Sequence, residues 1–160
     1  MKALKQLAEL EFRERYKNSS MPEYSRFKKR YSDRTANGLT RAIIDWLKLN
    51  GNQAERINTT GRMLDQRKVV TDVIGRTRQI GSTKWIKGSG QRGSADISAT
   101  IRGQSVKIEI KIGRDRQSEH QKEYQKQIEQ AGGQYWIIRT FDQFVELYNE
   151  KNPGGGPGQG

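Results

Sequence analysis

The clearest hydrophobic pattern in the chain is a strict alternation over two neighbouring segments, residues 95–101 and 106–112. In the first segment every odd-numbered position is apolar, and in the second every even-numbered position is apolar. A period of two predicts half-buried β-strands. The link between them, residues 102–105, is short and contains a glycine, so we expect the strands to form an antiparallel hairpin.

The register of this hairpin decides which polar side chains meet. With residues 103–104 at the tip, every apolar residue has an apolar partner, and Asp96 lies directly opposite Lys111 and diagonal to Glu109. Directly opposed Cβ atoms are about 5 Å apart and diagonal ones roughly 7–8 Å apart. The hairpin is therefore predicted to gather two carboxylates and an amine on one face, where the carboxylates can share a divalent cation.

A solvated charged face is the simpler interpretation of this hairpin. Two features favour a functional site instead. Aspartate is a poor strand former, yet Asp96 interrupts an otherwise good strand. The approach to it, residues 88–94, is rich in glycine, which lets a backbone come close to a ligand.

The remaining pattern predicts a compact α/β unit around the hairpin. Helical spacing of apolar residues, followed by Gly51, predicts a helix over residues 36–50. Ser118 is expected to start another helix. The other expected elements are strands at 56–60, 69–74 and 134–139, a short strand around Trp85, a last helix from Phe141, and short amphipathic helices at 4–12 and 24–31.

These elements suggest three segments of different character. Residues 1–36 hold ten Lys and Arg against five Asp and Glu, and are predicted to form a basic helical arm. Residues 37–152 are expected to form the single folded domain that 160 residues allow. Residues 153–160 are almost entirely glycine and proline, so we expect a disordered tail.

The net charge of the chain indicates the kind of partner that it binds. The formal net charge is +12, which favours a polyanion, with nucleic acid before an anionic membrane. No apolar run approaches the ~18 residues of a membrane span, so we expect no membrane insertion, and we expect no signal peptide. The chain has no cysteine and a single histidine, His120. A metal site would therefore use oxygen ligands, which suit Mg²⁺ or Mn²⁺.

Four sequence stretches follow one another in a recognisable order: G-S-A-D-I at 93–97, V-K-I-E-I-K at 106–111, D-R-Q-S-E-H-Q at 115–121 and A-G-G-Q-Y-W-I-I-R at 131–139. This order resembles the PD-(D/E)XK nuclease superfamily, and specifically the virus-type replication–repair nuclease (VRR-NUC) family. The resemblance implies an α/β fold with a restriction-endonuclease-like core, in which a central mixed sheet is flanked by helices.

The resemblance also implies an activity, that of a metal-dependent DNA endonuclease in replication, repair or recombination. Asp96 and Glu109 would be carboxylate ligands of Mg²⁺ or Mn²⁺, the backbone carbonyl of Ile110 a further ligand, and Lys111 the catalytic lysine. Phosphodiester hydrolysis needs an activated water and stabilisation of charge on phosphate, which a hard cation supplies. A preference for branched, flapped or nicked DNA is compatible with this role.

Gln121 has two interpretations. The family places a helix glutamine near its active site, and here Gln121 would share a helix face with Tyr124 and Ile128. However, Ser118-x-x-Gln121 is also a capping box, in which the glutamine only returns to the start of the helix. His120 lies on a different face and is expected at the surface.

One departure from the family concerns its first helix, which often contributes a glutamate near its start. This chain offers Asn37 there instead, which brings no charge. The departure leaves open one metal or two, and motivates the alternative of an inactive nuclease fold that only binds DNA. An RNA-binding protein of ribosomal type is a third possibility, which rests on charge alone.

Further residues are candidates for binding DNA. Arg56 and Asn58 belong to a segment resembling the family's R-x-N-x-x-G, although an edge strand with outward polar residues is the simpler explanation of them. A basic stretch is expected to crowd the approach to Asp96 as a phosphate track, with Trp85 either stacking on a base or buried in the core. Its cations are Arg76, Arg78, Lys84, Lys87 and Arg92.

The resemblance extends to location. The family occurs in phages and bacteria, which implies a cytoplasmic, intracellular protein. A phage-encoded member would act inside a bacterial host. A homodimer and a monomer are both compatible with the sequence, because enzymes that cut both strands symmetrically are often dimers whereas flap and nick cutters need not be.

Overall fold

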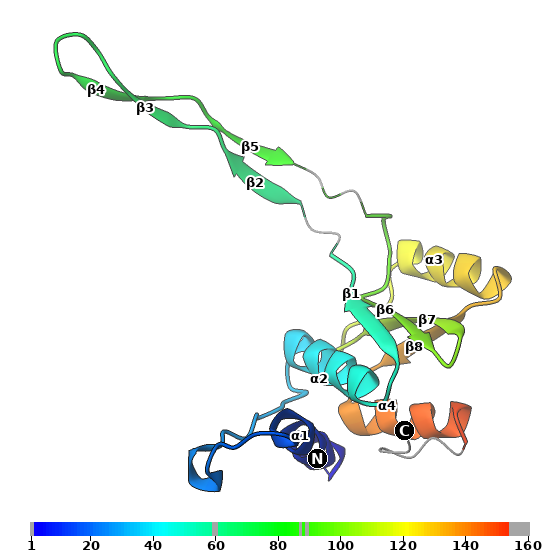
Figure 1. The fold of residues 1–160 in the computed structure, drawn as a ribbon. Coiled ribbons are helices and arrows are strands. Elements are labelled where there is room, and N and C mark those ends of the chain that lie inside the picture. Colours follow the sequence, from blue (N-terminus) through cyan, green and yellow to red (C-terminus); the bar gives the residue numbers. More distant parts are fainter. Residues whose placement is uncertain (1, 59–60, 87, 89, 154–160) are drawn as a thin grey trace.

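The computed structural model describes residues 2–58, 61–86, 88 and 90–153. Its centre is a four-stranded sheet in which the first three strands are antiparallel and the last is parallel to its neighbour (Figure 1). In spatial order the strands are β1 (Gln53–Arg56), β6 (Ile97–Ile101), β7 (Gln104–Ile110) and β8 (Gln134–Ile138). The predicted α/β fold with a mixed central sheet is therefore confirmed.

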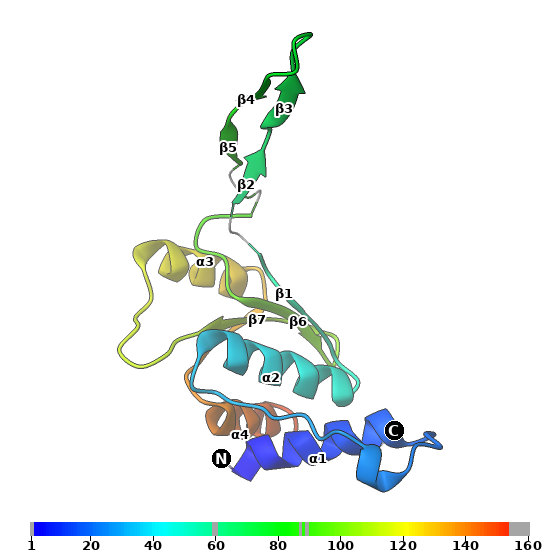
Figure 2. The ribbon, with the colours of Figure 1, turned by 90° about the vertical axis from the view of Figure 1, so that its left-hand side faces the viewer.

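Helices cover both faces of this sheet (Figures 1 and 2). α2 (Ala36–Leu49) and α4 (Phe141–Lys151) lie on one face, and α3 (Glu119–Gln130) lies on the other. The predicted helices at 36–50, from Ser118 and from Phe141 are thus confirmed. No helix among the described residues is both long and apolar enough to cross a membrane.

The core lies between the sheet and α2 with α4. Leu39, Ile43 and Leu47 of α2 are fully buried, at the helical spacing that the sequence shows. They meet the apolar face of the sheet, where Ile97 and Ile108 are fully buried as well. The strict alternation of the hairpin is therefore explained by one face that packs on helices and one that carries polar side chains.

The N-terminal segment contributes one helix rather than two. α1 (Lys2–Tyr16) packs on α2 and α4, and its Leu7 is fully buried in the core. The second predicted helix, at 24–31, is wrong: only a short 3₁₀ helix, η1 (Glu23–Ser25), forms there. A short isolated helix is marginal in water. Instead, Lys28 reaches Glu9 of α1 in the extended segment that follows.

The predicted register of the central hairpin is also wrong, by two residues. Ile97 pairs with Ile108, and the turn consists of only Arg102 and Gly103. Both turn residues have positive φ, 49° and 82°, as a two-residue type I′ turn requires. A shift of two keeps every apolar residue on the apolar face, so the hydrophobic pattern could not distinguish the two registers.

Between β1 and β6 the chain forms a long two-stranded hairpin that projects from the core (Figures 1 and 2). It consists of β2 (Arg62–Asp65) paired with β5 (Thr83–Ile86), and β3 (Lys68–Thr71) paired with β4 (Thr77–Ile80). The predicted strand at 69–74 corresponds to β3 over residues 69–71, whereas residues 72–74 belong to the tip. The short strand expected around Trp85 is confirmed as β5, but Trp85 is exposed rather than in the core.

Two other predictions concern residues that the structure leaves partly undescribed. The strand expected at 56–60 overlaps the observed β1 only at Arg56, and residues 57 and 58 belong to no strand. Residues 59 and 60 lie outside the described residues. The tail expected at 153–160 lies outside them from residue 154 onward.

Candidate active site

The corrected register brings the two predicted carboxylates together more directly. Asp96 immediately precedes β6, and extending the ladder past Ile97 places it opposite Glu109 rather than opposite Lys111. The backbone N–H of Ile110 donates to Oδ2 of Asp96 at 2.9 Å. Because the N–H and carbonyl of a strand residue point to the same side, the Ile110 carbonyl faces the Asp96 side of β7.

Lys111 directly follows β7, and three oxygen atoms lie close to its ammonium. The distances from its Nζ are 3.0 Å to Oε1 of Glu109, 3.0 Å to Oε1 of Gln121 and 3.3 Å to Oδ2 of Asp115. Lys111 and Glu109 are 4% and 3% exposed, whereas the side chain of Asp115 is 57% exposed. Lys111 therefore forms ion pairs with the buried Glu109 and the exposed Asp115, and a hydrogen bond to the half-buried Gln121.

Gln121 completes the predicted capping box and also contacts Glu109 and Lys111. Its Oε1 accepts from the backbone N–H of Ser118 at 3.0 Å, and Oγ of Ser118 accepts from the Gln121 N–H at 3.3 Å, which completes the capping box. The same side chain donates from Nε2 to Oε1 of Glu109 at 2.5 Å, besides accepting from Lys111. The first turn of α3 is thereby tied to the charged residues of β7. His120, as expected, is exposed.

A glycine allows the loop before Asp96 to lie against α3. Gly93 has φ of +82°, and a Cβ there would collide with the carbonyl of His120 and approach the N–H of Gln121. Only glycine combines this backbone conformation with so close an approach. The G-S-A-D stretch therefore positions the start of α3 as well as Asp96.

The electrostatics of the site are those of a crowded, partly desolvated pair of acids beside a cation. Burial raises the pKa of Glu109, and the charge of Asp96 raises it further, against the opposing effect of Lys111. Burial alone would lower the pKa of Lys111, but its contacts with Glu109 and Asp115 outweigh burial and raise it. Lys111 is therefore protonated at neutral pH.

Two further residues at the site were not predicted. The Tyr135 hydroxyl on β8 donates to Oε2 of Glu109 at 3.4 Å, and burial together with the Glu109 charge raises the Tyr135 pKa. Asp115 contacts Lys111. Tyr135 belongs to an apolar strand, and an aromatic residue in such a strand is expected to be a core residue. The parallel pairing of β7 with β8 could have identified it, because Tyr135 is the partner of Lys107, which shares a face with Glu109.

The donor set suits a hard divalent cation. Asp96 and Glu109 supply carboxylates, and the Ile110 carbonyl faces the same side. Among the described residues, no group of three or more His, Cys, Asp and Glu could hold a metal ion. Mg²⁺ commonly uses only one or two carboxylates and takes its other oxygens from water and substrate phosphate. A cation would also offset the repulsion by Asp96, which adds to the effect of burial in raising the pKa of Glu109.

Asn37 and Arg56, which were also predicted as site residues, do not lie with Asp96 and Glu109. Asn37 is exposed in the first turn of α2, and within the described chain no hydrogen bond links it to Asp96 or Glu109. Arg56 pairs with Ile97 on β6 and therefore lies on the α2 side of the sheet, opposite to the side of Glu109. Asn58 is exposed just beyond β1.

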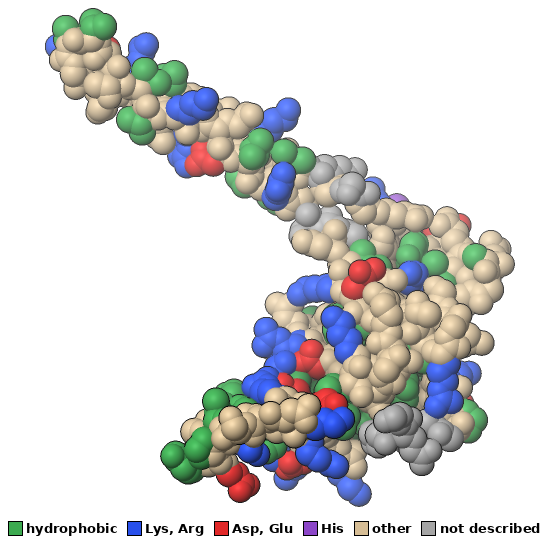
Figure 3. All heavy atoms as spheres, in the orientation of Figure 1, with side chains coloured by type: hydrophobic (Ala, Val, Ile, Leu, Met, Phe, Trp, Pro, Cys, Tyr) green, Lys and Arg blue, Asp and Glu red, His purple; other side chains and the backbone are tan. Residues whose placement is uncertain are grey.

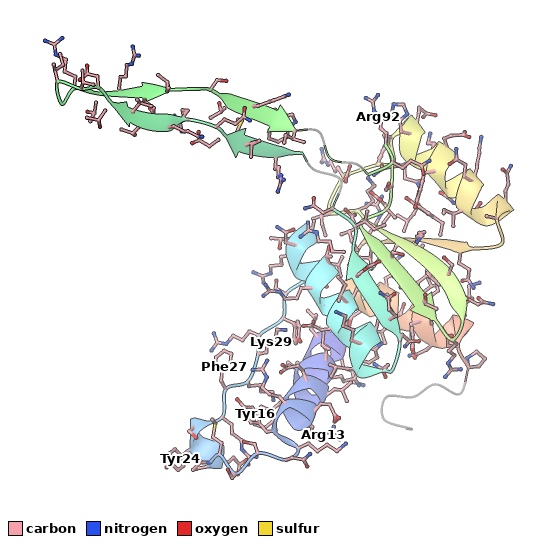
Figure 4. All side chains as sticks on the ribbon, turned by 45° about the horizontal axis from the view of Figure 1, so that its top comes forward. Arg13, Tyr16, Tyr24, Phe27, Lys29 and Arg92 are labelled. Carbon is pink, nitrogen blue, oxygen red and sulfur yellow. The ribbon has the colours of Figure 1, made fainter. Side chains whose placement is uncertain are left out.

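The predicted phosphate track is not assembled around Asp96, and this expectation is corrected. Arg76 at the tip, Arg78 in β4 and Lys84 in β5 all belong to the projecting hairpin, because the stretch forms paired strands instead of a loop. Arg92 alone of the described members stays near the site, beside the first turn of α3 (Figure 4). Lys87 lies outside the described residues.

Comparison of the chain with protein-family models and with curated proteins gives no match. The geometry of the site and the order of its motifs therefore carry the functional interpretation.

Proposed function

We propose that the protein is a divalent-metal-dependent DNA nuclease with a restriction-endonuclease-like core, whose reactive centre consists of Asp96, Glu109 and Lys111. The observation that carries the proposal is the convergence of these side chains with Gln121 at one end of β7. Adjacent carboxylates beside a protonated lysine match what metal-assisted phosphodiester hydrolysis requires. The net charge of +12 favours a polyanionic substrate.

The protein side chains have distinct tasks in this proposal. Asp96, Glu109 and the Ile110 carbonyl would hold Mg²⁺ or Mn²⁺, which supplies an activated water and charge for the phosphoryl oxygens. Hydrolysis joins the water oxygen to phosphorus and breaks one P–O bond, whose oxygen leaves with a proton. Because Lys111 is protonated at neutral pH, it serves as a donor to the developing negative charge rather than as a base.

The contacts of Lys111 indicate how a phosphate would enter. Glu109 and Gln121 hold the ammonium at 3.0 Å, whereas Asp115 is more distant and far more exposed. A phosphate oxygen would therefore replace Asp115 and leave the contacts with Glu109 and Gln121 intact. In this arrangement Gln121 is a positioning residue, which keeps both Glu109 and Lys111 in place.

The test is cleavage of labelled duplex, flap, four-way-junction and single-stranded DNA with Mg²⁺ or Mn²⁺. The variant is Asp96→Asn, and the matched control is Glu119→Gln, an exposed acid in the first turn of α3. Metal-dependent cutting by wild type and control but not by Asp96→Asn is the expected result, and the preferred DNA identifies the task. Equal cutting by Asp96→Asn would refute the assignment.

One observation favours a second candidate, a nuclease-like domain that binds DNA without cutting it. The family that the chain resembles often has a glutamate at the start of its first helix, where this chain has the uncharged Asn37. Among the described residues, no third acid joins Asp96 and Glu109 in a group that could hold a metal ion, because Asp115 is paired with Lys111 instead. Tight DNA binding without cleavage under either metal would support this candidate over the enzyme.

A further inference from the structure

The projecting hairpin, which we call the ribbon, pairs its two strands in two blocks within residues 62–86, β2 with β5 and β3 with β4. Asp65 pairs with Thr83, and Lys68 pairs with Ile80, so both strands advance by three residues between these pairs. A backbone hydrogen bond joins the strands within the interval, and the ladder therefore has no bulge. At about 3.3 Å per residue, the paired stretch is roughly 30 Å long.

This unbroken register sorts the side chains of the ribbon onto two faces. Side chains alternate along a strand, so the even-numbered residues share one face, and each cation there lies directly opposite an aliphatic residue. These pairs are Arg62 with Ile86, Leu64 with Lys84, Lys68 with Ile80, and Val70 with Arg78. We call this the cationic face; none of its strand residues is an acid, and the even-numbered Asp72 lies in the turn beyond β3. The opposite face contains Asp65, which is already paired with Arg67.

The core does not cover the ribbon. Every residue of β3, β4 and β5 is exposed, and Figure 3 shows cationic and apolar side chains side by side along its length. On the cationic face Ile80 and Val70 are 45% and 37% exposed, and on the opposite face Val69 and Trp85 are 70% and 60% exposed. Exposed apolar surface on this scale indicates an interaction surface.

The tip of the ribbon is apolar and held in a defined turn. The carboxylate of Asp72 accepts from the backbone N–H of Ile74 at 3.1 Å and from that of Arg76 at 2.8 Å. Gly75, with φ of 81°, completes the turn. Val73 is fully exposed and Ile74 is 71% exposed. The turn thus presents two aliphatic side chains at the outermost point of the molecule.

Charge decides which partner this surface fits. Residues 62–86 contain six Lys and Arg but only two Asp, one of which is ion-paired. A second copy of the ribbon would bring like charges together, whereas a polyanion would neutralise them. The major groove of B-DNA admits a two-stranded β-ribbon, and one turn of the duplex measures about 34–36 Å, close to the length of the ribbon.

We infer that the ribbon is an arm that binds a groove of duplex DNA through its cationic face, with Val73 and Ile74 lodged against the bases at its end. Apolar side chains of such arms can wedge between base pairs and kink the duplex. The inference shares with the proposed function the premise that DNA is the partner, but does not require that the DNA be cut. The ribbon joins the core between β1 and Asp96, so DNA held by it would lie near the candidate active site.

The first experiment measures the salt dependence of duplex binding without divalent metal, so that cleavage plays no part. Lys68→Gln/Arg78→Gln removes two cations from the cationic face. Lys48→Gln/Lys151→Gln removes two exposed cations from the last turns of α2 and α4 as the matched control. We expect the slope of log K against log salt to fall in magnitude by about two for the ribbon variant only. Equal slopes in the two variants would overturn the inference.

The second experiment examines the tip with a duplex containing 2-aminopurine, whose fluorescence rises when bases unstack. Val73→Ser/Ile74→Ser is expected to abolish the rise seen with wild type and to leave the salt slope unchanged. An unaltered rise in the variant would overturn the placement of the tip. A dimer in sedimentation that these changes dissociate, with DNA binding intact, would identify the ribbon as a self-association arm instead.

The two proposals fail separately. Binding that depends on the ribbon, without cleavage under any metal, would refute the nuclease and leave the arm. If the protein cleaves DNA but its DNA affinity does not change when the ribbon is altered, only the inference about the arm is refuted.

Discussion

Gln121 donates a hydrogen bond from its Nε2 to Oε1 of Glu109 at 2.5 Å, and so joins the first turn of α3 to the centre of the candidate active site. The same amide accepts from Lys111 and from the backbone of Ser118. One side chain therefore both begins a helix and holds two charged groups in place. We therefore expect the loss of the Gln121 side chain to lower activity by more than the accompanying loss of stability would explain.

A comparison of Gln121→Ala with Ser118→Ala tests this coupling. Ser118→Ala removes the cap and should cost about 1 kcal/mol of unfolding free energy, with the Gln121 contacts to Glu109 and Lys111 retained. Gln121→Ala should lower the cleavage rate by a further 10–100-fold, roughly the loss typical of positioning residues around metal ligands. Denaturant unfolding and single-turnover cleavage measure the two effects. Equal activity losses in the two variants would show that the glutamine is only a cap.

Lys111→Met should impair both folding and catalysis. It removes the cation from a buried pair with Glu109 and leaves that carboxylate uncompensated, which typically costs about 3–5 kcal/mol. The loss of its donor should slow cleavage by roughly 10²–10³-fold. Denaturant unfolding and cleavage under saturating metal measure these losses.

Lys111→Arg separates the two effects, because it keeps the charge but changes the shape of the donor. We expect stability close to wild type with a reduced rate. A Lys111→Met protein that cuts as fast as wild type would remove Lys111 from the mechanism.

Gly93→Ala should disturb the site through the backbone. A methyl group there meets the His120 carbonyl, in addition to the strain of positive φ. Gly103→Ala is the matched control, because Gly103 has the same φ of +82° and no atom within 4 Å of the added Cβ. The control should cost about 1–2 kcal/mol, and Gly93→Ala should cost about 1–3 kcal/mol more through overpacking, with loss of activity. Equal unfolding free energies would show that the loop and α3 are not in close contact.

The raised pKa of Glu109 predicts a dependence of stability on pH. The folded chain holds this proton more tightly than the unfolded chain. The resulting stabilisation is complete below the ordinary value of 4.5 and is lost as the pH rises through the higher folded pKa. Glu109→Gln should remove this component of the pH dependence, as measured by denaturant unfolding across the acid range. An unchanged profile in the variant would contradict the assignment.

The same proton should compete with a metal. A carboxylate must be ionised to act as a ligand, so Mn²⁺ affinity should begin to fall at a higher pH than for an ordinary glutamate. Calorimetric titration of wild type from neutral to mildly acid pH measures this. An affinity independent of pH would indicate that Glu109 is not a ligand.

Local patterns were sufficient for much of the fold. The alternation around Asp96 and Glu109 correctly predicted which side chains share a face, because strand geometry makes that face a matter of odd or even position. Helix boundaries were predictable too, since Ser118 and Gly51 act through their own neighbouring backbone. The second N-terminal helix failed because its segment is held by contacts such as Lys28 with Glu9, which no local pattern contains.

By itself, then, the sequence determined the faces of the strands, the main helices and the chemical types available for a site. The tertiary structure decided which of these meet. A two-residue shift leaves the apolar face unchanged, so only the turn at Arg102 placed Asp96 opposite Glu109. Only the packing of α3 brought Gln121 to Lys111. Only strand pairing drew Arg78 and Lys84 away from the site onto a ribbon, because contacts between distant residues depend on geometry that periodicity does not encode.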